Sequence, residues 1–140
     1  MFSIIEYTDS HFDGVDALWQ DAFPNDTPWN AARSSIPEKL RHQPTLLLVV
    51  LESGRVVGSI MAGYDGHRGW ISRIAVLQSH RRKGIGEALI QEAERRLAAL
   101  GCVKINLQVV ASNSEVLGFY HKCGYEVEER VSMSKLLPKA

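Results

Sequence analysis

The segment with the clearest chemical potential is Arg81-Arg82-Lys83-Gly84-Ile85-Gly86, preceded by His80. It lies between a predicted strand and the most regular predicted helix, so free main-chain N–H groups and the positive end of a helix dipole lie beside three cationic side chains. The glycines let an anion approach the main chain because no Cβ intrudes, and they tolerate positive φ angles. The segment predicts a site for a phosphate-bearing ligand. The alternative is a surface turn with solvated basic residues.

Two common phosphate motifs do not fit this segment. A P-loop would place its lysine after the second glycine and before Ser or Thr, whereas Lys83 precedes Gly84. The dinucleotide fingerprint requires a small residue three positions after Gly86, where Leu89 stands. Sixteen basic residues balance sixteen acidic ones and no aromatic residues interleave with the basic cluster, so we expect no nucleic-acid partner.

The whole chain has the size and composition of one compact domain. Its 140 residues with 45% hydrophobic content predict a single domain over 1–140. No window approaches the length of a membrane span, and residues 1–6 lack a basic lead and a long apolar run, so a cytoplasmic protein without a membrane partner is expected. Cys102 and Cys123 form no Cys-x-x-Cys pair and have no zinc-ligand spacing, which predicts reduced thiols and no metal site.

The hydrophobic pattern predicts alternating strands and helices that would position this segment. Strands are expected over 3–7, 45–51, 56–64, 70–76, 103–110 and 125–136, and helices from Asp9 or Ser10 to Phe23, over 29–40, over 84–100 and over 112–123. Ser53-Gly54 is expected to form a two-residue hairpin turn, Pro37 to break or kink the second helix, and Gly101 to end the third. This order predicts an α/β (α+β) fold, a mixed sheet with helices packed on it.

Two segments resemble the core of a known enzyme family. Arg81-x-x-Gly84-x-Gly86, after the strand Ile71–Val76, resembles the coenzyme A signature Gln/Arg-x-x-Gly-x-Gly/Ala of the GNAT N-acetyltransferase superfamily. Ser112-Asn113, followed by the run Phe119-Tyr120-His121-Lys122-Cys123-Gly124-Tyr125-Glu126, resembles the second half of that core, at the expected distance. Together these segments cover most of residues 70–126.

Three further strings are similar to a small bacterial group, the YpeA-like acetyltransferases: Pro28-Trp29-Asn30, Gly63-Tyr64-Asp65-Gly66-His67-Arg68-Gly69 and Val116-Leu117-Gly118-Phe119-Tyr120. The superfamily resemblance implies a GNAT-type, mostly antiparallel sheet of about six strands with about four helices and splayed central strands. It also implies transfer of an acetyl group from acetyl-CoA to a primary amine by direct attack, without a metal. A small molecule such as an amino acid is favoured over a protein as the acceptor, and a peptide amine is the alternative. A homodimer is also an open alternative.

The resemblance also assigns residues to the cofactor. The coenzyme would contact the main chain of the strand at Ile74, Ala75 and Val76. It would also contact the loop and the first helical turn, and two downstream residues: Arg81, Arg82, Lys83, Gly84, Ile85, Gly86 and Glu87, then Asn113 and Tyr120. An N–H near Val76 would stabilise the oxyanion of the reaction. Asn113, which precedes a predicted helix, is alternatively a helix cap.

Tyr120 is the predicted catalytic residue, because a tyrosine at this position in the family lies near the thioester sulfur and can protonate the departing thiolate. With an ordinary pKa of about 10 it keeps its proton at neutral pH, as a general acid must. The alternative is a half-buried aromatic residue on a short helix, like Phe119.

The general base is less well defined. Some relatives that acetylate peptide N-termini carry a glutamate where this chain has Gln108, which cannot accept a proton. Asp65 and His67 are the nearest candidates, directly or through water, and a polar turn is the alternative explanation of both. Gln108 also leaves open a non-catalytic coenzyme A-binding or sensor domain.

The acceptor would lie between two walls. The resemblance places Trp29 and Asn30 on one wall, although Trp29 is alternatively a core anchor. The facing wall would contain Tyr64, Asp65, His67 and Arg68. Arg68 would suit an acceptor with a carboxylate, because a guanidinium binds a carboxylate in a bidentate geometry.

Overall fold

The structure of the protein, a computed structural model, describes residues 1–110 and 113–138. It divides into two compact units, Met1–Gln108 and Val109–Ala140. The larger unit contains, in chain order, β1 (Ser3–Glu6), α1 (Phe12–Ala22), α2 (Ala32–His42), β2 (Leu47–Glu52), β3 (Arg55–Tyr64), β4 (Gly69–Val76), α3 (Ile85–Ala99) and β5 (Ile105–Asn106). The smaller unit contains α4 (Ser114–Lys122). Short 3-10 turns occur in the larger unit at Asp9–His11, Pro28–Asn30, Pro44–Leu46 and Gln78–His80.

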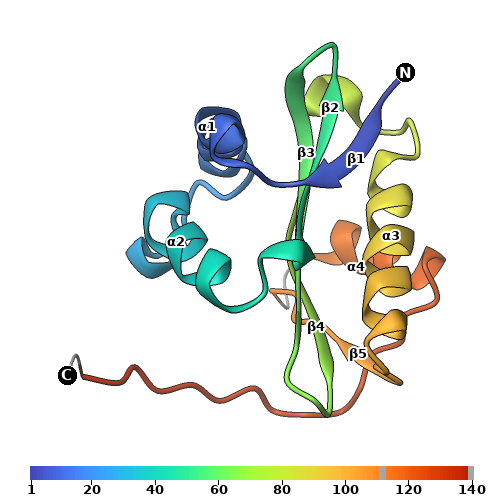
Figure 1. Cartoon of the computed structure of the whole chain (residues 1–140). Coiled ribbons are helices and arrows are strands. Elements are labelled where there is room, and N and C mark those ends of the chain that lie inside the picture. The colour runs from blue at the N-terminus through green and yellow to red at the C-terminus, as the bar shows by residue number, and fades with distance from the viewer. Residues whose placement is uncertain (111–112, 139–140) are drawn as a thin grey trace. The chain divides into compact units, whose positions relative to one another are not determined.

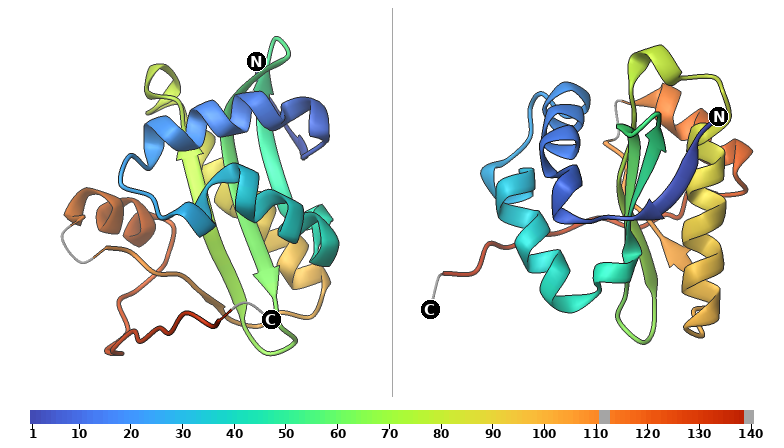
Figure 2. Two further views of the ribbon diagram at one scale, coloured as in Figure 1. Left: turned by 90° about the vertical axis from the view of Figure 1, so that its left-hand side faces the viewer. Right: turned by 45° about the horizontal axis from the view of Figure 1, so that its top comes forward.

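The sheet of the larger unit has the strand order β1-β2-β3-β4-β5. Strands β1 to β4 form an antiparallel meander, and β5 pairs with β4 in parallel. Helices α1 and α2 cover one face and α3 covers the other (Figures 1 and 2). All four residues from Leu47 to Val50 are therefore buried, as expected for a strand with helices on both sides.

The core between α1, α2 and the sheet follows the predicted helical pattern. Its buried members are Tyr7, Val15, Leu18, Trp19, Ala32, Ile36, Leu47, Val49, Val56 and Ala75. On the other face α3 buries Ile85, Leu89, Ile90, Ala93 and Leu97, and its bounds confirm the predicted helix. The hairpin turn is also confirmed, because Ser53 and Gly54 have φ angles of 52° and 77°, the left-handed pair that a two-residue turn requires.

A β-bulge interrupts β4 at its centre. Ser59 on β3 pairs with Ala75 and Met61 pairs with Ser72, so Arg73 and Ile74 oppose a single residue of β3. Arg73 adopts a φ of 54°, in the left-handed region that non-glycine residues rarely occupy. The bulge re-aims the strand immediately before the segment predicted to contact the coenzyme.

Strands β4 and β5 pair only at their first residues, Gly69 with Ile105 and Trp70 with Asn106. Among the described residues, the edge of β4 from Ile71 to Val76 therefore has no strand partner on this side. Because β5 ends at Asn106, the predicted splay of the central strands stays a prediction.

Several predicted boundaries were wrong. The first helix is preceded by Thr8 and a 3-10 turn, not capped by Asp9 or Ser10. The second helix starts at Ala32, because Pro28–Asn30 form a separate turn, and it continues through Pro37 without the predicted break. A proline inside a helix costs about 3 kcal/mol, which burial of Ala32 and Ile36 against the core offsets here.

The two C-terminal strand predictions were also wrong in extent or existence. The strand predicted over 103–110 is only the pair Ile105–Asn106, and residues 125–138 have no regular secondary structure, so the sheet has five strands and not six. Val127, Val131 and Met133 remain 68%, 88% and 90% exposed, so their alternation is not used for packing.

Gly14 in α1 offers a stability test. A glycine-to-alanine change inside a helix normally stabilises by about 1 kcal/mol. Here a Cβ would lie 2.9 Å from Cβ of Val56 on β3, a group that cannot move without shifting the strand. We expect Gly14→Ala to lower the free energy of unfolding by about 1–2 kcal/mol because overpacking outweighs helix propensity. Denaturant unfolding measures this change, with Ser34→Ala, at an exposed position in α2, as the control variant. A Gly14→Ala variant more stable than the wild type would contradict this packing.

Candidate functional site

The predicted phosphate segment forms a loop with two left-handed residues before α3. Arg82 has a φ of 64° and Gly84 a φ of 79°, and α3 begins at Ile85. The first main-chain bond of the helix runs from the N–H of Ala88 to the carbonyl of Gly84, at 3.1 Å. Within the described part of the chain, the N–H groups of residues 82–87 donate to no protein acceptor. Six main-chain donors at the positive end of a helix dipole are thus available to an anion.

A buried histidine anchors the start of this loop. His80 is 9% exposed, its Nε2 lies 3.0 Å from Oε1 of Glu52 on β2, and its Nδ1 lies 2.8 Å from Oγ of Ser79. The hydrogen bond from His80 holds the pKa of Glu52 below its usual range. These contacts fix the loop to the sheet.

The three cations of the loop do not have equal roles. The side chain of Arg81 turns back to its own strand, where Nε donates to the carbonyl of Val76 at 3.3 Å. Arg82 and Lys83 are exposed. Main-chain donors and the side chains of Arg82 and Lys83 are therefore better placed for a phosphate than the guanidinium of Arg81.

The strand residues predicted to contact the coenzyme lie directly before this loop. Ala75 is buried, and Ile74 and Val76 are half-buried, along the edge of β4 that has no strand partner. The N–H of Leu77 donates to the carbonyl of Val57 at 2.9 Å and so keeps the end of β4 on β3. The bulge, the open strand edge and the loop are contiguous over residues 73–87.

The turn from Tyr64 to Arg68 is built around Asp65. Its Oδ1 accepts hydrogen bonds from the N–H groups of Arg68, at 2.7 Å, and His67, at 2.8 Å. These bonds hold the pKa of Asp65 below its usual range, which makes the carboxylate a weaker proton acceptor. The geometry matches the polar turn given above as the alternative explanation of this motif.

Two residues that sequence reasoning missed, Lys39 in α2 and Gln43 directly after it, hold the end of β3. Gln43 clamps the main chain of Tyr64, accepting from its N–H at 3.0 Å and donating to its carbonyl at 2.8 Å. Lys39 donates to the carbonyl of Ala62, and burial lowers the pKa of Lys39. No local pattern marks either residue, since both contacts join positions more than twenty residues apart.

The segment before α2 lies close to the bulge. Trp29 is 53% exposed, which excludes its alternative role as a core anchor. The main-chain carbonyl of Asn30 accepts a hydrogen bond from Nη2 of Arg73 at 2.8 Å, and the same nitrogen contacts Asp26. Sequence reasoning missed Arg73 and Asp26.

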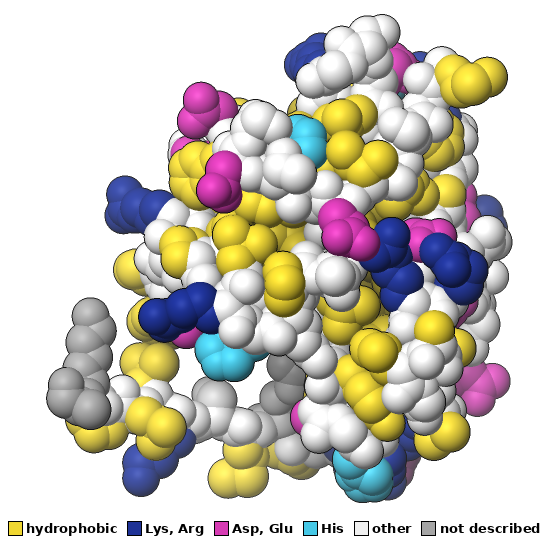
Figure 3. Space-filling view, in the orientation of Figure 1, with side chains coloured by type: hydrophobic (Ala, Val, Ile, Leu, Met, Phe, Trp, Pro, Cys, Tyr) yellow, Lys and Arg dark blue, Asp and Glu magenta, His cyan; other side chains and the backbone are white. Residues whose placement is uncertain are grey.

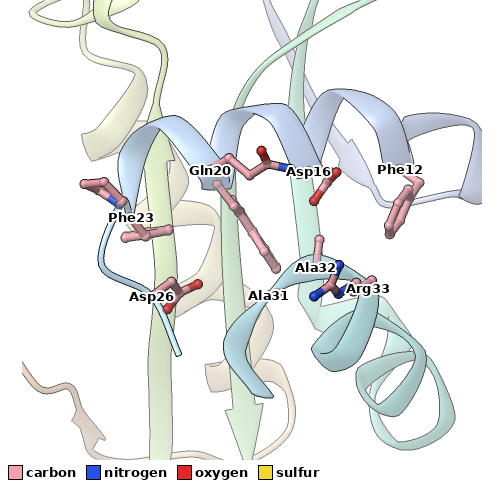
Figure 4. A pocket seen from close by; sticks show the side chains of 10 residues that line it. Phe12, Asp16, Gln20, Phe23, Asp26, Ala31, Ala32 and Arg33 are labelled. Carbon is pink, nitrogen blue, oxygen red and sulfur yellow. Dashed lines mark hydrogen bonds between the residues drawn. The ribbon is translucent and has the colours of Figure 1, made fainter. Parts of the chain in front are cut away.

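A hollow of about 580 Å³ lies between α1 and α2. Figure 4 shows Asp16 and Gln20 on α1 and Arg33 at the start of α2, on its two sides. Its lining residues are Phe12, Asp16, Trp19, Gln20, Phe23, Pro24, Asp26, Ala31, Ala32 and Arg33. Trp29 and Asn30 are adjacent in sequence to this lining but do not form part of it.

The remaining predicted residues belong to the smaller unit. Oδ1 of Asn113 accepts from the N–H of Val116 at 3.3 Å, so Asn113 caps α4. Tyr120 is 7% exposed, and burial raises its pKa to about 12. The rings of Phe119 and Tyr125 contact it edge to face. The hydroxyl of Tyr120 therefore keeps its proton across the physiological pH range. Ser112, which was predicted beside Asn113, lies outside the described residues.

Other classes of site have little structural support. In the described ranges, no group of three or more His, Cys, Asp or Glu side chains could hold a metal ion, and no helix is both long enough and apolar enough to cross a bilayer. Neither Cys102 nor Cys123 forms a disulfide within the described ranges. Acidic and basic side chains are interspersed on the face in Figure 3, without a continuous basic surface there.

Comparisons with known proteins identify the family of the chain. The profile of the acetyltransferase (GNAT) family matches residues 12–125. An acetyltransferase of Yersinia enterocolitica is 40% identical over 131 residues, which cover 94% of this chain and 92% of the relative.

Two solved structures share the fold. Ard1 from Thermoplasma volcanium has a TM-score of 0.82 at 24% identity, and the alignment covers 91% of this chain and 84% of the Ard1 chain. AAC(6')-Iy, solved with the bisubstrate analog CoA-S-monomethyl-acetylneamine, has a TM-score of 0.80 at 19% identity and covers 99% of both chains. These likenesses show the fold, while the profile and the Yersinia relative show the family. The chain belongs to the acetyltransferase (GNAT) family.

Proposed function

We propose that this acetyltransferase moves the acetyl group of acetyl-CoA to a small primary amine, with the pyrophosphate of the coenzyme on the main chain of residues 82–87. The observation that carries the proposal is the set of six N–H groups at the start of α3 for which the described residues provide no acceptor. Gly84 and Gly86 leave room for close approach, and charge-assisted bonds from main-chain N–H groups to phosphate are strong. The coenzyme A-containing analog bound to AAC(6')-Iy supports this donor for the fold.

The open edge of β4 supplies the second contact. A free strand edge presents main-chain N–H and carbonyl groups that can pair with the amides of a pantetheine arm, in the way a strand would. We assign this pairing to Ile74 and Val76, with Ala75 between them buried as a packing residue. A main-chain N–H near Val76 would then stabilise the oxyanion formed when the amine attacks the thioester carbonyl.

Tyr120 is assigned as the proton donor to the leaving sulfur. In the net reaction an N–C bond forms, the C–S bond breaks, the amine nitrogen loses a proton and the sulfur gains one. A tyrosine with a pKa of about 12 is protonated at neutral pH, but it is a weaker acid than a thiol, whose pKa is about 8.5. Tyr120 would therefore act by a hydrogen bond to the developing thiolate. It would regain any proton that it gives from the nitrogen, which becomes cationic once the amine has added to the carbonyl.

The amine has to arrive deprotonated or lose a proton at the site. Gln108 cannot accept one, and the carboxylate of Asp65 is engaged in its own turn. His67, which is exposed on the same turn, is the better candidate for a water-mediated base. Trp29 and the turn from Tyr64 to Arg68 are proposed as the acceptor walls, and Arg68 would bind a carboxylate on an amino-acid acceptor.

The pH dependence follows from these assignments. We expect kcat/KM to rise as pH increases from 6 towards 10, because the free-amine fraction of a primary amine with a pKa of about 10.4 rises over this range. Burial raises the pKa of Tyr120 to about 12, so its ionisation adds no falling limb below about pH 10.5. Initial rates at saturating acetyl-CoA measure this. A fall above pH 8 with intact protein would argue against Tyr120 as the proton donor.

A thiol-release screen tests the proposed function. Acetyl-CoA is offered with amino acids, polyamines, aminoglycosides and short peptides with free N-termini, and thermal unfolding is measured with and without coenzyme A. We expect coenzyme A to raise the melting temperature and at least one small amine to release thiol. Stabilisation without any release would favour a non-catalytic coenzyme A binder, and absence of both would refute the proposal.

A further inference from the structure

Arg73 is a non-glycine residue held in a left-handed conformation at the bulge of β4. Its φ of 54° costs on the order of 1–2 kcal/mol relative to an extended residue, so the surrounding contacts must impose it. Ser59 Oγ donates to the carbonyl of Arg73 at 2.9 Å, and Nε1 of Trp19 donates to the same hydroxyl at 2.8 Å. Ser59 is fully buried, so this relay ties the bulge to α1 within the core.

The side chain of Arg73 makes a second connection, to the segment between α1 and α2. Its Nη2 lies 2.8 Å and 2.7 Å from the two carboxylate oxygens of Asp26 and 2.8 Å from the carbonyl of Asn30. The guanidinium also packs over the rings of Phe23, at 4.5 Å, and Trp19, at 5.1 Å. The side chains of Arg73 and Asp26 are only 11% and 21% exposed, which strengthens the ion pair relative to a surface pair.

These two connections join the parts of the molecule that handle the two substrates. The backbone of Arg73 precedes Ile74–Val76, the proposed contacts of the pantetheine arm. Its guanidinium binds residues on both sides of Trp29, the proposed acceptor wall. A displacement of about 1 Å between reacting groups can lower a rate by about 10²-fold. The distance between the proposed acceptor wall and the proposed coenzyme contacts therefore affects the rate of acetyl transfer.

We infer that Arg73 is a positioning residue that holds the acceptor-side segment 23–31 in fixed register with the coenzyme-binding edge of β4. The inference rests on the proposed acetyl transfer for its kinetic consequence, but the connection itself can be tested without activity. Lysine cannot replace it fully, because it lacks the planar group that packs on two rings while contacting Asp26.

Arg73→Gly separates the side chain from the backbone. Glycine adopts a φ of 54° without strain, so the bulge is retained while the guanidinium is lost. We expect hydrogen exchange of peptides within 23–31 to become at least fivefold faster in Arg73→Gly and in Asp26→Asn, and exchange in α3 to stay unchanged. Arg41→Met, which removes an exposed arginine paired with Glu38, is the matched control and should leave 23–31 unchanged.

Kinetics then separate positioning from a purely structural role. For an amine that the wild-type enzyme acetylates in the screen above, we expect Arg73→Gly to lower kcat/KM for the amine at least tenfold and to leave the KM for acetyl-CoA within twofold. Arg73→Lys should restore part of the loss. Asp26→Asn in the Arg73→Gly background should add little, because the two residues act together.

Three outcomes would overturn the inference. Unchanged exchange over 23–31 would show that Arg73 does not hold the segment. Faster exchange with unchanged amine kinetics would show that the connection is structural only, and an equal rise in both KM values would point to a general loss of structure. If no amine is acetylated by the wild-type enzyme, the proposed function fails, while the exchange result still decides whether the connection exists.

Discussion

Replacement of Gly86 by valine is expected to weaken binding of acetyl-CoA by about 10²-fold or more. Gly86 lies in the first turn of α3 among the six main-chain donors assigned to the pyrophosphate. A branched side chain there would hold the phosphates away from these N–H groups, and each charge-assisted bond lost is worth about 1.5–3 kcal/mol. A hundredfold change in affinity corresponds to about 2.7 kcal/mol, so the loss of one or two such bonds suffices.

Calorimetric titration with coenzyme A, together with the KM for acetyl-CoA, measures this effect. Gln91→Val, at an exposed position of the same helix, is the matched control for placing a branched side chain on α3. The control should bind coenzyme A normally. Affinity within twofold of the wild type in Gly86→Val would place the pyrophosphate somewhere other than the start of α3.

Removal of the Tyr120 hydroxyl is expected to lower kcat by about 10²-fold. A positioned general acid or hydrogen-bond donor typically contributes about 10²–10⁴-fold, and phenylalanine keeps the buried ring and its contacts with neighbouring aromatics. The KM for acetyl-CoA should change little, because the hydroxyl acts on the departing sulfur. Steady-state rates of Tyr120→Phe at several pH values measure both quantities.

Tyr7→Phe is a matched control for this variant. Tyr7 is also 7% exposed, and burial raises its pKa as well, but it lies in the core between α1 and the sheet. It should retain full activity. If Tyr120→Phe also turned over at the wild-type rate, another group would have to stabilise the thiolate and Tyr120 would be a packing residue.

Local signals in the sequence were sufficient for the loop and for α3. The repeat of apolar residues from Ile85 to Leu97 and the glycines at 84 and 101 are short-range features, and the structure places helix, start and end within one or two residues of the prediction. The meander was equally accessible, because the Ser53-Gly54 turn fixes the pairing of its two neighbouring strands.

Features that depend on distant partners could not be predicted. Residues 125–136 alternate like a strand, yet residues 125–138 have no regular secondary structure, because alternation alone does not determine where a segment pairs. The second helix tolerates Pro37 because of tertiary burial that local propensity does not report.

The acceptor side shows the same limit. The strings containing Trp29 and Asp65 drew attention to two surface segments, whereas the contacts that fix them come from Arg73, Lys39 and Gln43. Arg73 and Asp26 are separated by 47 positions, and only the fold brings them together. Sequence patterns drew attention to these segments, but they did not reveal the contacts that hold them.

Amide hydrogen exchange at residues 82–87, with and without saturating coenzyme A, tests the central claim most directly. The N–H groups of these residues have no acceptor in the described part of the chain, so in the free protein they should exchange quickly. If they bind the pyrophosphate, their exchange should slow by about tenfold or more in the complex, while exposed amides of α2 remain unchanged. Binding of coenzyme A without slower exchange at residues 82–87 would contradict the account.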